Sequence, residues 1–586
     1  MIMKEPRSSD TRHSWHCFPL IVLVAVIAYV PTFTGSFILD DRPLIEKNPY
    51  VTELHSLRSY LSQEDGITDR GHSESCHTGY YRPLINLTYW IDYRLWGMTA
   101  SGFRTTNLIL HLLCCLALFK FLILLVDNRW AVCGVVAIFA LHPVNTESVS
   151  WVTSRNNIVV TLFIILSLYW YIITWIKKST ISFVPAACCF ACALLSKEFA
   201  VMLLPVFFLC HRLLFHGERH YAREASRYVP LVLIVIGYFI LRYGVTDSVL
   251  TPADLSDFWQ RVYFVPYLIA WNLKLILLPW NLHSFHITYP ADYLDGRAVS
   301  SIALFIALCL FLWYRRRNRL LLFSGLSSLL FMFPVLNVVP TAAISLVAMR
   351  WIYLPMAFSS IAAALVLQWG INHRKAFTAA VLCLFVAYCG AYTFVLNQYL
   401  WHDEHVFFTK EVEQFGNKQL YAGDLAEILY QRARYAEAER YFLIAIESRP
   451  HDARSHINYA ALLIDDGRHE LALSYLEAAK EFAKTIEDRK ELLNNMGVAL
   501  AHSGKKEEAA DCLRRALELD PAYAEAHNNY GVVLMYQGRI AAAVGSFQEA
   551  LKHNRGYAEA ANNLKIALSL RHTKEKEDNV QKRLAQ

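Results

Sequence analysis

Phe18-Pro-Leu-Ile-Val-Leu-Val-Ala-Val-Ile-Ala-Tyr29 is an unbroken apolar run, and the chain stays largely apolar up to Phe37. A helix needs about 20 predominantly apolar residues to cross a bilayer, so we expect a first membrane span over residues 16–36. Basic residues precede the run but no small-residue cleavage site follows it, which predicts an uncleaved anchor rather than a signal peptide. Two adjacent carboxylates, Asp40 and Asp41, follow where this span leaves the membrane.

The composition extends this expectation to most of the chain. Of its 586 residues, 55% are hydrophobic and only 18% are charged, whereas about 25% are charged in soluble domains. Further apolar segments of spanning length lie near residues 104–126, 130–150, 155–176, 180–196, 199–215, 228–244, 298–314, 320–338, 346–368 and 376–397. We therefore expect an all-α membrane bundle of about eleven spans. A further segment, 259–279, contains Asn272 and Lys274 and is ambiguous between a crossing and an interfacial helix.

The distribution of basic residues supports this count. Basic clusters lie at residues 4–12, 129, 177–178, 212–227, 315–319 and 374–375. With eleven spans, all of these basic clusters fall on one side of the membrane. The positive-inside rule identifies that side as the cytoplasm. The first long loop, residues 38–103, and everything after residue 397 then lie on the opposite side. The net charge of +6 is modest and sits in short loops, so it is a topology signal and disfavours nucleic-acid binding.

A second domain begins near residue 419, where the sequence starts to repeat with a period of about 34 residues. Small and bulky side chains recur in matching columns: Ala438, Ala472, Ala509 and Ala543 in one, Phe442, Leu476, Leu513 and Phe547 in another. This pattern predicts tetratricopeptide repeats, in which small residues let paired helices approach. The chain then divides into a membrane domain (1–400), a linker (401–418), a repeat solenoid (419–572) and a charged tail (573–586).

The positions of the cysteines do not predict a fold held together by disulfide bonds. Of thirteen cysteines, eleven lie inside apolar segments, where they act as small hydrophobic side chains. No Cys-x-x-Cys pair with matching histidines occurs in a polar region, so both a zinc site and a disulfide framework are disfavoured.

Polar residues suited to chemistry gather in the loops on the predicted non-cytoplasmic side. Asp40 and Asp41 either act as a general base on a hydroxyl group or end the first span as charges paired with Arg42. Arg82, beside two tyrosines, either binds a lipid phosphate or anchors the chain at the membrane surface.

Two more candidates share a helix face inside a span. Asn107 and His111 are four residues apart and therefore point the same way. Polar groups inside a membrane face a cavity or a partner helix, and both interpretations stay open.

The remaining candidates lie near predicted helix ends. His142, Glu147 and Arg155 follow the third span and either converge on the carboxylates or form a polar turn. Lys197 and Glu198 form a short turn, either as a structural ion pair or as part of a site. Arg350 lies at another turn, where a guanidinium is suited to clamp a phosphate. Neither a Walker-type phosphate loop nor an HExxH motif occurs.

The ordered set of these motifs resembles a known family. The motifs are Leu39-Asp-Asp-Arg42, Tyr81-Arg-Pro-Leu84, Asn107-x-x-x-His111, His142-Pro-x-x-Thr-Glu147, Lys197-Glu198 and Arg350-Trp-Ile-Tyr-Leu-Pro355. Together with the repeats, they resemble the membrane-spanning, tetratricopeptide-repeat-containing O-mannosyltransferases and their bacterial relatives, which belong to the glycosyltransferase C superfamily. Met349 departs from the eukaryotic members, which usually carry Glu before this arginine, and it favours a bacterial branch.

The resemblance implies an enzyme that moves a mannose-like hexose from a polyprenyl-phosphate carrier to a hydroxyl acceptor, a protein Ser/Thr or a glycan, on the non-cytoplasmic face. Asp40 and Asp41 would form the active-site pair, one as the base and the other orienting it or holding a metal ion. No cofactor is certain, and a divalent metal ion stays open. The predicted lipid-phosphate and substrate ligands are Arg82, Asn107, His111, His142, Glu147, Arg155, Lys197, Glu198 and Arg350. The repeats would present a concave surface to the acceptor.

Two other functions stay open. An oligosaccharide ligase of the O-antigen type also combines many spans with such repeats, but is expected to carry basic catalytic residues in a large late loop. A non-catalytic scaffold would use the spans as an anchor and the repeats as a binding module, but it does not explain polar groups gathered on one face. We expect a bacterial inner membrane with the repeats in the periplasm or, alternatively, an endoplasmic reticulum membrane with the repeats in the lumen.

Overall fold

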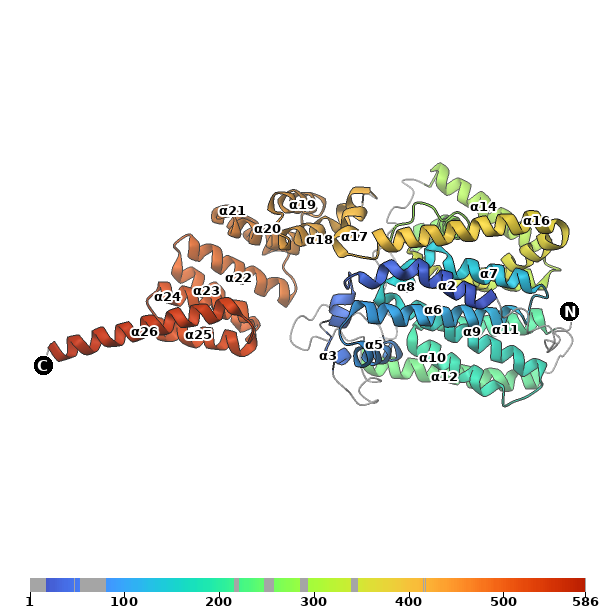
Figure 1. Cartoon of the computed structure of the whole chain (residues 1–586), viewed down its shortest axis with the longest axis horizontal. Coiled ribbons are helices and arrows are strands. Elements are labelled where there is room, and N and C mark those ends of the chain that lie inside the picture. Colours follow the sequence, from blue (N-terminus) through green and yellow to red (C-terminus); the bar gives the residue numbers. More distant parts are fainter. Residues whose placement is uncertain are drawn as a thin grey trace. The chain divides into compact units, whose positions relative to one another are not determined.

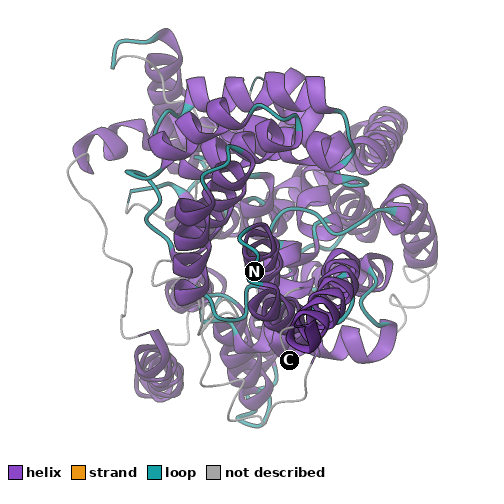
Figure 2. Ribbon diagram, turned by 90° about the vertical axis from the view of Figure 1, so that its left-hand side faces the viewer, coloured by secondary structure: helices purple, strands orange, loops and turns teal. Residues whose placement is uncertain are grey.

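The computed structural model describes residues 17–46, 48–52, 81–215, 221–246, 258–284, 293–338, 346–414, 416 and 418–584. Within these residues the regular elements are helices, and no β-strand occurs among them (Figure 2). The chain forms two compact units that divide between Phe407 and Phe408, inside the predicted linker. Two histidines of the first loop, His72 and His77, lie outside the described residues.

The first unit is a helix bundle. Its α-helices are α2 (Cys17–Tyr29), α3 (Pro49–Thr52), α5 (Pro83–Trp96), α6 (Ala100–Leu122), α7 (Arg129–Leu141), α8 (Thr146–Ser150), α9 (Arg155–Ile176), α10 (Phe183–Ser196), α11 (Leu203–Leu214), α12 (Tyr221–Thr246), α13 (Phe258–Leu277), α14 (Gly296–Tyr314), α15 (Arg319–Met332) and α16 (Tyr353–Tyr399). Helix α9 packs against α6 and α10, and α10 packs against α12, so these four run side by side (Figure 1).

Six described segments are long and apolar enough to cross a membrane: Cys17–Thr34, Ala100–Leu122, Val152–Ile176, Ser226–Val245, Gly296–Tyr314 and Tyr353–Tyr399. The bent pair α7 and α8 adds a seventh if it counts as one span, and α10 and α15 are apolar but shorter. The predicted all-α membrane bundle is confirmed, whereas the predicted number of about eleven spans is not. Within the range of α16, the non-helical residue Arg374 separates the predicted spans 346–368 and 376–397, so this range holds two helical segments although it counts once.

The end of α7 shows how local sequence shapes the site. The Asn128 side chain caps its start by accepting hydrogen bonds from the backbone N–H groups of Trp130 and Ala131. The helix ends at Leu141 because Pro143 has no backbone N–H to continue it. The chain then bends by 45° into the short helical stretch Pro143–Ser150. This stretch carries Glu147, one of the predicted site residues.

A disulfide bond joins Cys17 at the start of α2 to Cys133 in α7. The prediction that cysteines in apolar segments serve only as small hydrophobic side chains is wrong for this pair. The two residues are 116 positions apart in the sequence, and only the packing of α2 on α7 brings them together.

The second unit contains paired helices of the predicted length: α18 (Lys418–Gln431), α19 (Tyr435–Ser448), α20 (Ala453–Asp465), α21 (His469–Ala479), α22 (Ile486–His502), α23 (Lys506–Leu519), α24 (Ala524–Tyr536) and α25 (Ile540–His553), followed by α26 (Ala558–Leu584). The alanine column and the bulky column are both fully buried, with 0% of each side chain exposed. Each alanine and bulky residue therefore packs between helices, and the predicted repeat architecture is confirmed.

Close packing within a repeat gives a first test of stability. A Cβ atom added to Gly531 would lie 2.5 Å from the Phe547 ring. We expect Gly531→Ala to destabilise the repeat unit by about 1–3 kcal/mol, since a ring in a packed helix pair has little room to move. Thermal unfolding of the full chain in detergent measures the loss. Gly545→Ala is the matched control: Gly545 lies in α25 with no atom near an added Cβ, so Ala there should be neutral or stabilising. Equal melting temperatures for both variants would contradict this account of the packing.

Candidate active site

Asp40 and Asp41 lie on a tight turn after the short helix η1 (Val30–Thr34), and their surroundings differ. Leu39, just before them, has a left-handed backbone conformation with φ of 52°. Asp41 is fully buried: its Oδ1 accepts a hydrogen bond from the backbone N–H of Thr153 at 2.9 Å, and its Oδ2 one from that of Ile38 at 3.3 Å. The Asp40 side chain is exposed. Asp41 therefore holds the turn in place, whereas Asp40 is open to a ligand.

The protein environment changes the acidity of both carboxyl groups. Burial raises the pKa of Asp41 to about 7, although Arg104 and the two backbone N–H groups favour its charged form. The pKa of Asp40 is also raised, because the surrounding protein limits its hydration, while the charge of Arg350 acts in the opposite direction. Asp40 is therefore accessible to an acceptor hydroxyl, as a general base must be.

Arg350 lies beside this turn in a fixed orientation. It belongs to the short helix η7 (Met349–Trp351), and its guanidinium pairs with the fully buried carboxylate of Glu147. Its backbone N–H donates to Glu147 Oε2 at 2.9 Å. The guanidinium also lies 5.0 Å from the ring centre of Trp151 and 5.5 Å from that of Trp351. A cation oriented in this way, with 17% of its side chain exposed, is suited to meet an anion.

A second basic group comes from the start of α5 and the turn after α10. Arg82 donates to Glu198 Oε1 at 3.1 Å, with both side chains partly exposed. Neighbouring Lys197 donates through Nζ to Asn157 Oδ1 at 2.6 Å. Burial, together with the charge of Arg82, lowers the pKa of Lys197 to about 7. Burial disfavours the charged form of Glu198, but Arg82 outweighs it and lowers the pKa of Glu198 to about 2.

These groups form one electrostatic cluster. Arg350 acts on both Asp40 and Lys197, and Lys197 also interacts with Arg82, Glu198 and Glu147. The fold therefore brings together six of the predicted site residues: Asp40, Arg82, Glu147, Lys197, Glu198 and Arg350. Within the described residues, no three His, Cys, Asp or Glu side chains lie close enough to hold a metal ion.

Comparison with known proteins agrees with this organisation. Residues 78–242 match the family model for dolichyl-phosphate-mannose-protein mannosyltransferases, and residues 451–522 and 494–563 match tetratricopeptide-repeat models. The chain is 25% identical over 375 residues to a protein O-mannosyl-transferase of Caenorhabditis elegans, covering 61% of this chain and 52% of that one. It is 26% identical over 538 residues to human protein O-mannosyl-transferase TMTC1, covering 82% and 56%. The chain is thus similar in sequence to proteins named protein O-mannosyl-transferases.

The chain spans about half the length of the two relatives just named, 52% and 56%. Among solved structures, the tetratricopeptide-repeat protein YrrB is 21% identical, with 29% of this chain and 86% of that chain covered and a TM-score of 0.24. The match to the mannosyltransferase model includes Arg82, Lys197 and Glu198 but ends before Arg350 and begins after Asp40. The assignment of Asp40 and Arg350 to the site is therefore supported by the geometry of the cluster and by the order of the motifs, and not by this match.

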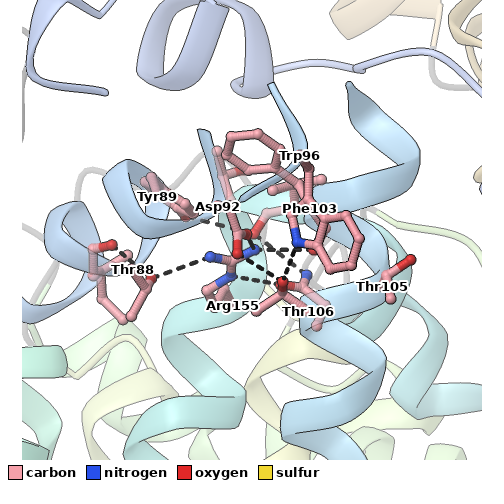
Figure 3. Close-up of polar contacts among 12 residues, drawn as sticks. Thr88, Tyr89, Asp92, Trp96, Phe103, Thr105, Thr106 and Arg155 are labelled. Carbon is pink, nitrogen blue, oxygen red and sulfur yellow. Dashed lines mark hydrogen bonds and ion pairs between the residues drawn. The ribbon is translucent and has the colours of Figure 1, made fainter. Parts of the chain in front are cut away.

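Asn107 and Arg155 belong to a buried polar network, in which Figure 3 shows Arg155 beside Asp92 and Thr88. Arg155 pairs with Asp92 of α5 and donates to Asn107 Oδ1 at 2.6 Å, to Thr88 Oγ1 at 3.2 Å and to the Phe103 carbonyl at 2.9 Å. Its guanidinium is thus fully engaged by protein groups. The expectation that Arg155 meets a lipid phosphate is not supported by this arrangement.

The two histidines among the predicted ligands, His111 and His142, are also buried and bonded to the protein. His111 lies 2.6 Å from the Tyr353 hydroxyl through Nδ1 and 3.1 Å from the Ala140 carbonyl through Nε2. His142 lies 3.0 Å from the Ile276 carbonyl through Nε2. Both side chains have 0% exposure. They join helices rather than line an open site, which is the alternative that the sequence left open for His111.

Arg104, which binds the acidic turn, was not among the predicted site residues. Its guanidinium donates to the carbonyls of Thr32 at 2.6 Å, Ser36 at 2.5 Å and Ser150 at 3.0 Å. Only 1% of Arg104 is exposed. One signal was available: a charged residue at the edge of an apolar span is costly and is retained for a reason.

Proposed function

We propose that this chain transfers a mannose-like hexose from a polyprenyl-phosphate carrier to a hydroxyl group, such as that of a protein Ser or Thr, on the non-cytoplasmic side. The observation that carries the proposal is the contrast between the two aspartates. Asp40 is exposed and lies within the electrostatic influence of Arg350, which also acts on Lys197, whereas Asp41 is buried and bonded to the backbone.

Asp40 acts as the general base of this reaction. Its carboxylate takes the proton of the acceptor hydroxyl as the hydroxyl oxygen attacks the anomeric carbon. The bond between that carbon and the phosphate oxygen breaks with its electron pair, so the configuration inverts and the lipid phosphate leaves with its full negative charge. Asp40 then returns the proton to solvent. A base placed in this way typically contributes about 10²–10⁴-fold in rate.

Arg82, Lys197 and Arg350 stabilise the leaving phosphate. Guanidinium groups offer two parallel N–H donors that match phosphate oxygens. Their partners Glu198 and Glu147 hold the two guanidiniums in position before the donor binds. The repeats supply a surface for the acceptor, by analogy with other helical repeat proteins.

The proposal is tested by transfer in vitro. Purified full-length chain in lipid nanodiscs is mixed with radiolabelled polyprenyl-phosphate mannose and a Ser/Thr-rich acceptor polypeptide. We expect label in the polypeptide, released by mild base as an O-linked sugar. Absence of transfer to any polypeptide or glycan acceptor, with the donor intact, would refute the proposed activity.

Lys197 makes donor binding depend on pH. Because burial and Arg82 lower its pKa to about 7, its ammonium group is charged below pH 7 and neutral above it. We expect the KM for the polyprenyl-phosphate donor to rise as the pH increases from 6 to 8. Lys197→Arg keeps the charge throughout, since guanidinium is always protonated, and should flatten the profile. A KM that changes equally with pH in both proteins would exclude Lys197 as the titrating group.

A further inference from the structure

Residues 401–404 follow α16, near the end of the first unit in the sequence, and contact the candidate site. Trp401 is fully buried, and its ring stacks on Trp151 with 6.3 Å between centroids and 16° between planes. Its indole N–H donates to Thr146 Oγ1 at 3.2 Å. Trp151 in turn lies beneath the Arg350 guanidinium at 5.0 Å. Trp401 therefore supports the ring on which a proposed phosphate ligand rests.

The next residues bind both sides of the acidic turn. The backbone carbonyl of His402 accepts a hydrogen bond from the Ser36 backbone N–H at 3.2 Å. The ring Nε2 of His402 lies 3.0 Å from Thr34 Oγ1. Glu404 pairs with Arg42. Asp40 thus lies between two points, Ser36 and Arg42, that the segment 401–404 fixes.

The approach at Gly35 leaves no space for a side chain. A Cβ atom added there would lie 2.0 Å from the His402 carbonyl oxygen and 2.5 Å from Nη1 of Arg104. Arg104 binds the same turn through the Thr32 and Ser36 carbonyls. Arg104 and the His402 carbonyl therefore both pack against the turn at Gly35.

We propose that Trp401, His402 and Glu404 form a clasp that positions Asp40 and Arg350 for transfer. This inference rests on the proposed function of the site. A general base must lie within hydrogen-bond reach of the acceptor hydroxyl, and a displacement of about 1 Å reduces rate by about 10²-fold. The side chain of Asp40 is exposed and follows a left-handed residue, Leu39, so contacts outside the turn must fix its position. The clasp provides these contacts, and its three members are positioning residues, since none of them touches the reacting atoms.

The ion pair between Arg42 and Glu404 allows a test by charge exchange. Glu404→Gln should lower kcat by about 10-fold or more while leaving the donor KM within about 2-fold, because Glu404 pairs with Arg42 on the acidic turn, whereas Arg350 is supported through Trp151 and Trp401, which are unchanged. The double variant Arg42→Glu/Glu404→Arg, which restores opposite charges, should recover most of the kcat. Arg297→Gln is the matched control: it breaks a similarly exposed pair with Asp295 and should leave kcat unchanged. An unchanged kcat in Glu404→Gln, or no recovery in the double variant, would overturn the clasp.

Hydrogen exchange separates the failure of this inference from failure of the proposed function. In Glu404→Gln and Trp401→Leu, the backbone amides of residues 36–46 should exchange faster than in the wild type, whatever reaction the protein catalyses. Asp40→Asn should not change this exchange, because the Asp40 side chain is exposed. Faster exchange in a protein without transferase activity would uphold the clasp and reject the proposed function. Unchanged exchange in both clasp variants would reject the clasp even in an active enzyme.

Discussion

Replacing Asp40 with Asn is expected to lower the rate of hexose transfer by about 10²–10⁴-fold, because the amide keeps the shape of the carboxylate but accepts no proton. The donor KM should change little, since the proposed phosphate ligands Arg82, Lys197 and Arg350 are untouched. Stability should also be preserved within about 0.5 kcal/mol, as for most exposed positions. Single-turnover transfer with the labelled donor measures the chemical step directly.

Asp41→Asn is the matched comparison, and its effect should be of another kind. Asp41 is buried and accepts two backbone hydrogen bonds, and an amide has one acceptor oxygen where the carboxylate has two. Loss of one bond to a buried N–H is expected to cost about 1–3 kcal/mol in stability. If Asp41→Asn abolished transfer without a change in melting while Asp40→Asn stayed active, the roles of the two residues would be the reverse of those proposed.

The pH dependence of stability provides an independent measure of Asp41. Its pKa is raised to about 7 in the folded protein from about 3.9 in an unfolded chain. The folded state therefore binds the proton more tightly, and the stabilisation present below pH 4 is lost as the pH rises towards 7. The melting temperature of the wild type should fall over this interval more than that of Asp41→Asn, which has no proton to lose there.

The parts of the fold that follow from local pattern could be predicted from the sequence. Apolar runs define helices regardless of what they pack against, and Ala438 and its counterparts in the other repeats identify the solenoid because each repeat contacts only its neighbours. The residues around Asp40 were predicted as part of a larger set because their loops fall on one predicted side of the membrane, and the sequence did not separate them from Asn107, His111, His142 and Arg155. The number of spans was not predictable in the same way, since several predicted segments form helices that are shorter than a bilayer requires, such as α10 and α15.

The partners of the charged residues were beyond the reach of sequence patterns. Arg82 meets Glu198, 116 residues away, and Arg350 meets Glu147, 203 residues away. Only tertiary packing decides whether a guanidinium meets a ligand, as proposed for Arg350, or a carboxylate inside the protein, as found for Arg155. Asp92, the carboxylate that engages Arg155, lies in α5, a helix too polar to resemble a membrane span, so its sequence context does not indicate this partner.

The pair formed by Asp92 and Arg155 should be the most sensitive point for stability. Both side chains are at most 1% exposed, and removal of one member of a buried ion pair leaves the other charge without compensation. We expect Asp92→Asn to destabilise the membrane unit by about 3–5 kcal/mol. Thermal unfolding of the full chain in detergent, with intrinsic fluorescence as the signal, measures this loss.

A double variant tests whether Arg155 stabilises the fold through its buried ion pair or binds the donor phosphate. Asp92→Leu with Arg155→Met removes both charges, so it should be clearly more stable than either single change. It should also retain a normal donor KM, because Arg155 is engaged by Asp92, Asn107 and Thr88 rather than by substrate. If the stabilised double variant instead bound the polyprenyl-phosphate donor at least 10-fold more weakly, Arg155 would have to leave this network to reach the phosphate. The site would then include α9 as well as the turn at Asp40, and the buried arrangement would describe a state before the donor binds.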